Sequence, residues 1–386
     1  MEQMIKSFVF TIVLIFSIFL FTSCTNKEKS LILSADLSEH ALYSTYNFGS
    51  TKKIIDVGIQ PLSLPEGIIG ELFAHDAVLL DALSELGYEL RIHPFYNSSD
   101  STNFLQSGDL EVVTGGDLPA IMASLNMDVV ITSLVKYGFS SIIAKEMMLI
   151  PDLKNKKIAY SPLSSAHFSL LDIIQGAGLR EKDVTLIPMQ LIEMGEALEN
   201  GLIDAFIADE PNTSLVLAGY DDSLVLCRSL NSSYLYFAES FVKTQPEIIR
   251  LILASQNRSM GWLRSSEINL KSALCWMGKS GEKIGYEGDL VDINHWYDIV
   301  KNDLLDVSAA GALPKYELEK NGRINYEFKS LKALGKIAGD ADWKKIEESF
   351  DPSFLNEVLK KSNYYSLKIY RFSENPSVNN KMSVSP

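Results

Sequence analysis

Short apolar runs alternate along the chain with longer segments in which apolar residues recur every three or four positions. This alternation is typical of strand–helix units built on a largely parallel sheet. The runs predict a first series of strands and then a second series, which follow one another at 53–59, 88–94, 110–114, 129–135 and 140–144, and at 154–160, 184–187 and 205–207. The sequence therefore predicts an α/β protein with two successive strand–helix series.

The segments between these strands have the period of amphipathic helices. One broad apolar face begins after Pro65 and continues to Gly87, which predicts a single long helix. Pro246 suits the first turn of another long helix that ends near Arg264. Shorter helices are predicted at 101–107, 118–125, 168–176 and 195–200, and a mainly helical region follows to 364, including 355–360.

The order of these elements predicts two lobes between which the chain crosses twice, near Tyr137 and near Tyr234. The first lobe would comprise 53–137 plus 236–364, and the second lobe 138–235. With 46% apolar residues, some 330 residues are enough for two cores. The end of the chain is rich in Asn, Ser and Pro, so 365–386 is predicted to be a tail.

The N-terminus has the pattern of an export signal. Lys6 precedes an apolar run over 8–21, which is shorter than the roughly 20 residues that a spanning helix needs. The small residues before Cys24 resemble a bacterial lipobox, which implies a signal peptide at 1–23, a lipid on Cys24 and a tether over 24–52. An ordinary secretion signal that happens to contain a cysteine is the alternative.

The charge and the reactive side chains narrow the class of protein. The chain has a net charge of −14 and no block of basic residues, which argues against nucleic acid or anionic lipid as a partner but not against a small anion. Cys227 and Cys275 could form one disulfide or remain free. The histidines have no metal-ligand spacing, and no nucleophile elbow, zinc-protease motif or phosphate loop occurs, so we expect no metal, no cofactor and no catalysis.

Several short motifs carry a resemblance to a known family. Gly108-Asp109 and the stretch 114–119 (TGGDLP) resemble the first-lobe signature of binding proteins for nitrate, taurine, alkanesulfonates and thiamine-pyrimidine precursors. The second-lobe motifs of that family have counterparts within 154–211, and its later helices resemble the segments around Pro246-Glu247, Trp262 and 351–355. The resemblance extends over about 54–360, in the order of the family.

This resemblance implies a two-lobed periplasmic-binding-protein type 2 fold. Each lobe would be a mainly parallel sheet flanked by helices, with a cleft at a two-strand hinge. The implied function is that of a monomeric solute-binding protein, anchored by lipid outside the cytoplasmic membrane. It would deliver a small sulfonate, nitrate or pyrimidine-like ligand to the permease and ATPase of an ABC importer by hinge closure.

Ligands of open α/β sheets bind outside the carboxyl ends of the strands, where helix N-termini offer free N–H groups. The candidate ligand contacts at such turns are Gln60, Gly116, Asp117, Ser161, Ser164, Ser165, His167, Asp209 and Glu210. Each has a structural alternative. Asp117 could be a helix N-cap, Ser164 and Ser165 could be caps, and His167 could simply be packed. Glu210 could belong to the turn beside the hinge.

Two other functions share this fold class. One is a cytosolic enzyme, such as the pyrimidine synthase of thiamine biosynthesis or the enzymes of the menaquinone pathway. The cysteine-rich metal motif of the synthase has no counterpart in this sequence, and the export signal argues against both enzymes. The other is a lipoprotein that senses its ligand without importing it, which one sequence does not distinguish from a transport component.

Overall fold

The computed structural model of the protein describes residues 31, 37, 39–48, 53–220, 222–285, 293–308 and 310–374. Its strands are β1 (Lys53–Ile59), β2 (Tyr88–Pro94), β3 (Val112–Gly116), β4 (Val129–Ala144), β5 (Lys157–Tyr160), β6 (Thr185–Pro188), β7 (Ala205–Ala208) and β8 (Leu224–Ala238). They form one sheet in the order β2-β1-β3-β8-β4-β7-β5-β6. The outer strands of each half pair in parallel, whereas β8 pairs antiparallel with both β3 and β4.

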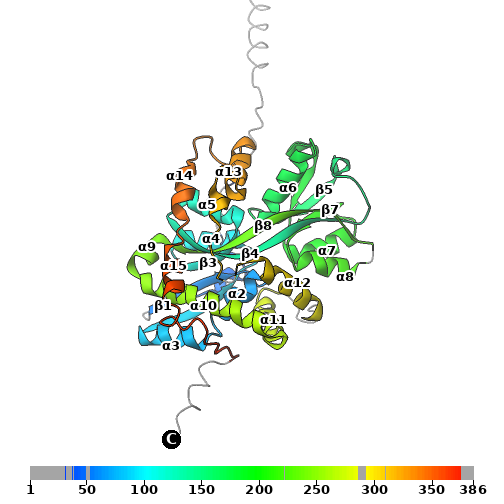
Figure 1. Ribbon diagram of the computed structural model, residues 1–386. Coiled ribbons are helices and arrows are strands. Elements are labelled where there is room, and N and C mark those ends of the chain that lie inside the picture. The colour runs from blue at the N-terminus through cyan, green and yellow to red at the C-terminus, as the bar shows by residue number, and fades with distance from the viewer. Residues whose placement is uncertain are drawn as a thin grey trace, which may run out of the picture.

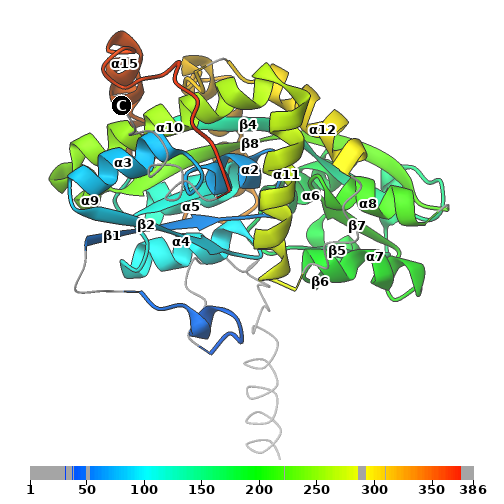
Figure 2. The ribbon, with the colours of Figure 1, turned by 90° about the horizontal axis from the view of Figure 1, so that it is seen from below.

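Helices cover the sheet on both sides (Figures 1 and 2). Those before β8 are α2 (Glu66–Leu72), α3 (Ala77–Glu85), α4 (Ser98–Ser107), α5 (Asp117–Asn126), α6 (Ser165–Gly176), α7 (Leu191–Glu199) and α8 (Asn212–Gly219). Those after it are α9 (Glu239–Thr244), α10 (Pro246–Ser265), α11 (Glu267–Glu282), α12 (Ile293–Asp306), α13 (Arg323–Ala333), α14 (Trp343–Ser349) and α15 (Ser353–Lys360). Short 3₁₀ turns are η1 (Tyr43–Thr45), η2 (Ile150–Leu153), η3 (Glu181–Asp183) and η5 (Lys315–Leu318).

The long strands β4 and β8 connect the two lobes, as Figure 1 shows. They pair from Val129↔Ala238 to Ala144↔Leu224, so each strand belongs to both lobes. Buried apolar residues form one large cluster from segments before and after this pair, and two smaller clusters within 142–216. The predicted two-lobed α/β architecture is confirmed, and we keep 53–137 plus 236–364 and 138–235 as the proposed lobe boundaries.

Two predictions of secondary structure are wrong. The single helix expected between Pro65 and Gly87 is divided into α2 and α3, because Asp76 caps α3 by accepting a hydrogen bond from the N–H of Val78 at 3.1 Å. Asp76 is also fixed by a fully buried ion pair with Arg258 at 2.6 Å, a partner that local periodicity cannot reveal. The two strands expected at 129–135 and 140–144 are one strand, β4, whose bulges interrupt the apolar pattern.

The segments next to both termini are more ordered than predicted. Within the expected tether, Tyr43 is buried and donates a hydrogen bond to Asp100 at 2.7 Å. Within the expected tail, Phe372 stacks on Trp262, and residues 365–374 pack on the first lobe. The signal peptide 1–23, Cys24 and residues 375–386 lie outside the described residues. No helix in the described part of the chain is both long and apolar enough to cross a membrane.

Candidate functional site: the cleft between the lobes

A cavity lies where the carboxyl ends of β1, β3, β5 and β7 meet, which is where ligands of such sheets bind. The space inside it, including its mouth, is about 500 Å³. The first lobe contributes Gln60, Leu62, Ser63, Glu66, Tyr96, Asn97, Ser98 and Gly116, the second lobe contributes Ser161, Ser164, Ser165, Ala166, Leu191 and Asp209, and Ser233 comes from β8.

The wall from the second lobe is the start of α6. Ser164 is the N-cap residue of this helix, and its hydroxyl accepts a hydrogen bond from the N–H of His167 at 3.1 Å. The same hydroxyl donates to the carbonyl of Ser161 at 2.8 Å. Ser165 is the first helical residue and is buried. Neutral hydrogen bonds therefore fix this wall, and Ser164 has the capping role while Ser165 does not.

The wall from the first lobe contains buried acceptors. The Nε2 group of Gln60 donates to Ser101 at 2.9 Å, while its Oε1 is buried and has no hydrogen-bond partner among the described residues. Oε2 of Glu66 accepts a hydrogen bond from Ser63 at 3.3 Å, and its Oε1 is likewise buried without a partner in the described chain. Burial raises the pKa of Glu66, against the opposing effect of Lys136.

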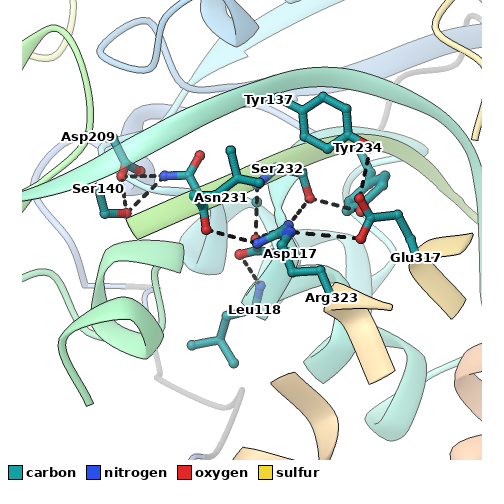
Figure 3. Close-up of polar contacts among 12 residues, drawn as sticks. Asp117, Leu118, Tyr137, Ser140, Asp209, Asn231, Ser232, Tyr234, Glu317 and Arg323 are labelled. Carbon is teal, nitrogen blue, oxygen red and sulfur yellow. Dashed lines mark hydrogen bonds and ion pairs between the residues drawn. The ribbon is translucent and has the colours of Figure 1, made fainter. Parts of the chain in front are cut away.

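Asp209 follows β7 directly and faces the hinge (Figure 3). Its Oδ1 accepts hydrogen bonds from Ser140 at 2.6 Å and from Asn231 at 2.8 Å, which belong to β4 and β8. Burial raises the pKa of this carboxyl, while Lys136 and the Ser140 hydrogen bond lower it. Neutral donors alone hold Asp209 in the described structure, because it forms no ion pair there.

Asp117 lies in a different environment, on the other side of β8 from Asp209 (Figure 3). Gly116 is the N-cap of α5 and Asp117 is the first helical residue, so the alternative in which Asp117 is the N-cap does not hold. Its carboxylate accepts from the N–H groups of Leu118 at 2.9 Å and Ser232 at 3.0 Å, and it forms an ion pair with Arg323 at 2.5 Å. With only 1% of its surface exposed, Asp117 does not line the cavity.

Two further candidates do not line the cavity either. His167 is buried, its Nδ1 accepts a hydrogen bond from the N–H of Leu163 at 3.2 Å, and its ring packs on Tyr160. Burial, reinforced by Lys336, lowers the pKa of His167 to about 3, so the imidazole is neutral. Glu210 lines a neighbouring groove, where it accepts a hydrogen bond from the N–H of Ser214 at 3.1 Å.

Part of the chain is similar to a known protein family. Residues 85–266 match the family model described as NMT1/THI5 like. The matched segment runs from the end of α3 to the end of α10, so it includes the whole second lobe and both hinge strands. A search of curated protein sequences gave no match.

Solved structures with the same fold include binding proteins and an enzyme. The alkanesulfonate-binding protein SsuA from Xanthomonas axonopodis pv. citri, bound to MOPS, is 15% identical, with a TM-score of 0.59 over 78% of this chain and 99% of its own. The periplasmic nitrate-binding protein NrtA from Synechocystis PCC 6803 is 10% identical, with a TM-score of 0.60 over 87% and 99%. The desulfurization enzyme DSZB is 13% identical, with a TM-score of 0.50 over 81% and 100%. These matches confirm the periplasmic-binding-protein type 2 fold.

The two lobes touch across the cleft. The N–H of Leu64 donates to the carbonyl of Glu210 at 3.1 Å, and Tyr326 donates to Asp172 at 2.6 Å. Gly116 lies directly against Ser165, since a Cβ atom at position 116 would overlap the serine hydroxyl. The structure is therefore a closed arrangement in which a larger residue at position 116 has no room.

Sequence reasoning located part of this cavity. Six of its candidates line the cavity: Gln60, Gly116, Ser161, Ser164, Ser165 and Asp209. It missed Glu66 and the segment 96–98, although each directly follows a strand or starts a helix, which is the signal used for the others. Among the described residues no group of His, Cys, Asp and Glu side chains could hold a metal, and Cys227 and Cys275 are both free.

Proposed function

We propose that this protein is an extracytoplasmic solute-binding protein that captures a small molecule in the cleft and delivers it to an ABC importer. The observation that supports this most is the cavity at four strand ends between two lobes that touch each other. Two binding proteins, one named for alkanesulfonates and one for nitrate, share the fold. Closure around the ligand would give the permease a surface that differs from the open form.

The test of this function is a substitution that prevents closure. Gly116→Leu introduces a side chain where Ser165 leaves no room, and the backbone of Gly116 has φ of −66°, which any residue adopts. We expect wild type to be stabilised by a member of a panel containing MOPS, taurine, nitrate and benzamidinium, and Gly116→Leu to lose that shift. Gly176→Leu is the matched control, because a Cβ at Gly176 meets nothing within 4 Å. Equal shifts in both variants would contradict closure at this cleft.

We also propose that Cys24 carries the lipid anchor. The support is the short apolar run followed by Thr22-Ser23-Cys24 in the sequence. A fatty-acid label should be incorporated into the wild type and be lost in Cys24→Ala. Label retained by the alanine variant would contradict the anchor. Stimulation of a reconstituted permease–ATPase pair by the loaded protein separates import from sensing.

An enzyme of the same fold is the second candidate, because DSZB resembles this chain at a TM-score of 0.50. The side chains around the cavity favour binding. The described lining of the cavity contains serine hydroxyls but no cysteine or histidine. The imidazole of His167, which follows the lining residue Ala166, receives a hydrogen bond from the N–H of Leu163. Recovery of an unchanged ligand after prolonged incubation supports binding, whereas its turnover supports the enzyme.

A further inference from the structure

Two residues that line the cavity each have a side-chain oxygen to which no described residue donates a hydrogen bond. Oε1 of Gln60 and Oε1 of Glu66 are both buried and without partners in the described structure, although the two side chains are only 3% and 2% exposed. A buried polar atom without a partner costs about 1–3 kcal/mol, so native structures retain few of them. Two such atoms in one cavity indicate that a bound molecule donates hydrogen bonds to them.

The charged residues around the cavity also favour a ligand that donates hydrogen bonds. Glu66 and Asp209 both line it, and neither forms an ion pair among the described residues. The described lining has no Lys, Arg or His. Lys136 is buried nearby, but its ammonium group donates to the hydroxyl of Ser63 at 3.1 Å and to the carbonyl of Leu64 at 3.3 Å. Lys136 thus acts electrostatically on both Glu66 and Asp209 but forms an ion pair with neither in the described structure.

The start of α6 on the opposite wall favours an anion instead, because a helix N-terminus is equivalent to roughly half a positive charge. An oxyanion could bind there only by approaching two carboxyl groups with no Lys or Arg in the described lining to compensate them. A ligand with a positive charge and N–H donors is attracted by the same carboxyl groups. It satisfies the unpartnered oxygens of Gln60 and Glu66 and balances the excess of negative charge.

We propose that the ligand presents a protonated amine or amidine to Gln60, Glu66 and Asp209, and that these three residues select a cationic hydrogen-bond donor over a free oxyanion. This inference rests on the proposed binding function and names the class of ligand for that cleft. An amidinium matches the site because its planar N–H groups donate to two acceptors at once. The Oδ1 atom of Asp209 is occupied by Ser140 and Asn231, so Oδ2 is the oxygen that would receive the ligand.

Ligand pairs of equal shape and opposite charge test this directly. The pairs are guanidinium and nitrate, acetamidinium and acetate, and benzamidinium and benzoate, with MOPS and taurine added as sulfonates. Titration calorimetry of the full chain at constant ionic strength should give at least one cation a dissociation constant tenfold or more below that of its anionic counterpart. Preference for the anion in the pairs that bind would overturn the ligand class and leave the binding function standing. No binding by any of these compounds would overturn both.

Variants of the acceptors assign the preference to these residues. Glu66→Gln and Asp209→Asn keep the shape of each side chain and should each weaken cation binding at least tenfold. Glu210→Gln is the matched control, because it removes the same charge from the residue next to Asp209 but lines another groove. The control should bind within threefold of wild type. An equal loss in Glu210→Gln, or no loss in the other two, would overturn the assignment.

Discussion

Two carboxylates flank β8, and their surroundings differ. Asp117 is neutralised by Arg323 and receives two backbone N–H groups, whereas Asp209 is held only by a serine hydroxyl and an asparagine amide. The first set of contacts fixes α5 to the hinge and to α13 and leaves no oxygen at the cavity. The contacts of Asp209 leave its negative charge and one carboxylate oxygen at the cavity. A carboxylate with a cation of its own stabilises the fold, while one without is available to a ligand.

The largest effect expected on the Asp117 side follows from removing its cation. Arg323→Met leaves Asp117 buried without a counter-charge, which should lower the free energy of unfolding by about 3–5 kcal/mol. The matched control is Arg250→Met, because Arg250 is 20% exposed against 17% for Arg323 but its partner Glu357 is much more exposed. We expect the control to cost less than about 1 kcal/mol. Urea unfolding measures both, and equal costs would remove the distinction between the two environments.

The cavity side should be sensitive to acid instead, because His167 is held there as a neutral ring. Its pKa is about 3 in the folded protein against 6.5 in the unfolded chain, so unfolding takes up a proton as the pH falls below 6.5. Stability should then decline by about 2 kcal/mol between pH 7 and pH 5 from this group alone. His167→Gln should show a correspondingly flatter stability profile over that range. An unchanged slope in the variant would mean that His167 is charged in the folded protein.

The smallest expected effect separates two adjacent serines on the same wall. Ser164→Ala removes the hydroxyl that caps α6 and should lower the free energy of unfolding by about 1 kcal/mol. Ser165→Ala removes a hydroxyl that does not cap the helix, so its stability should stay within about 0.5 kcal/mol of wild type. Thermal melts of both variants decide this. A larger loss for Ser165→Ala would reverse the roles that the structure gives them.

The sequence predicts features that depend on residues close together along the chain, and it does not predict those that depend on distant partners. Strand ends and helix starts are local signals, which is why Gly116, Ser164 and Asp209 were found. The environment of Asp117 depends on Arg323, some 200 residues later, and nothing around Asp117 in the sequence indicates that pair. For the same reason the break between α2 and α3 was missed, since Asp76 is fixed by Arg258.

The hinge strands show a second limit of sequence patterns. Between Leu224 and Ala238, β8 contains a polar stretch that includes Asn231, Ser232 and Ser233. This stretch interrupts the apolar pattern, so the sequence predicts no strand there. These polar residues are buried because they serve the carboxylates on both sides: Asn231 donates to Asp209, and the N–H of Ser232 to Asp117. A hinge that holds polar groups lacks the periodicity by which strands are recognised.

One crossed measurement tests the account most directly: binding and stability determined together for Asp209→Asn and Asp117→Asn, with benzamidinium as the ligand. We predict that Asp209→Asn loses at least tenfold in calorimetric affinity without a fall in melting temperature, because only the neutral donors Ser140 and Asn231 hold this side chain and no ion pair of the described structure depends on its charge. Asp117→Asn should melt at a lower temperature, because Arg323 loses its ion pair at 2.5 Å and keeps only the longer one with Glu317 at 3.8 Å, and it should bind within threefold of wild type. The opposite pattern, with affinity lost in Asp117→Asn and retained in Asp209→Asn, would contradict the account.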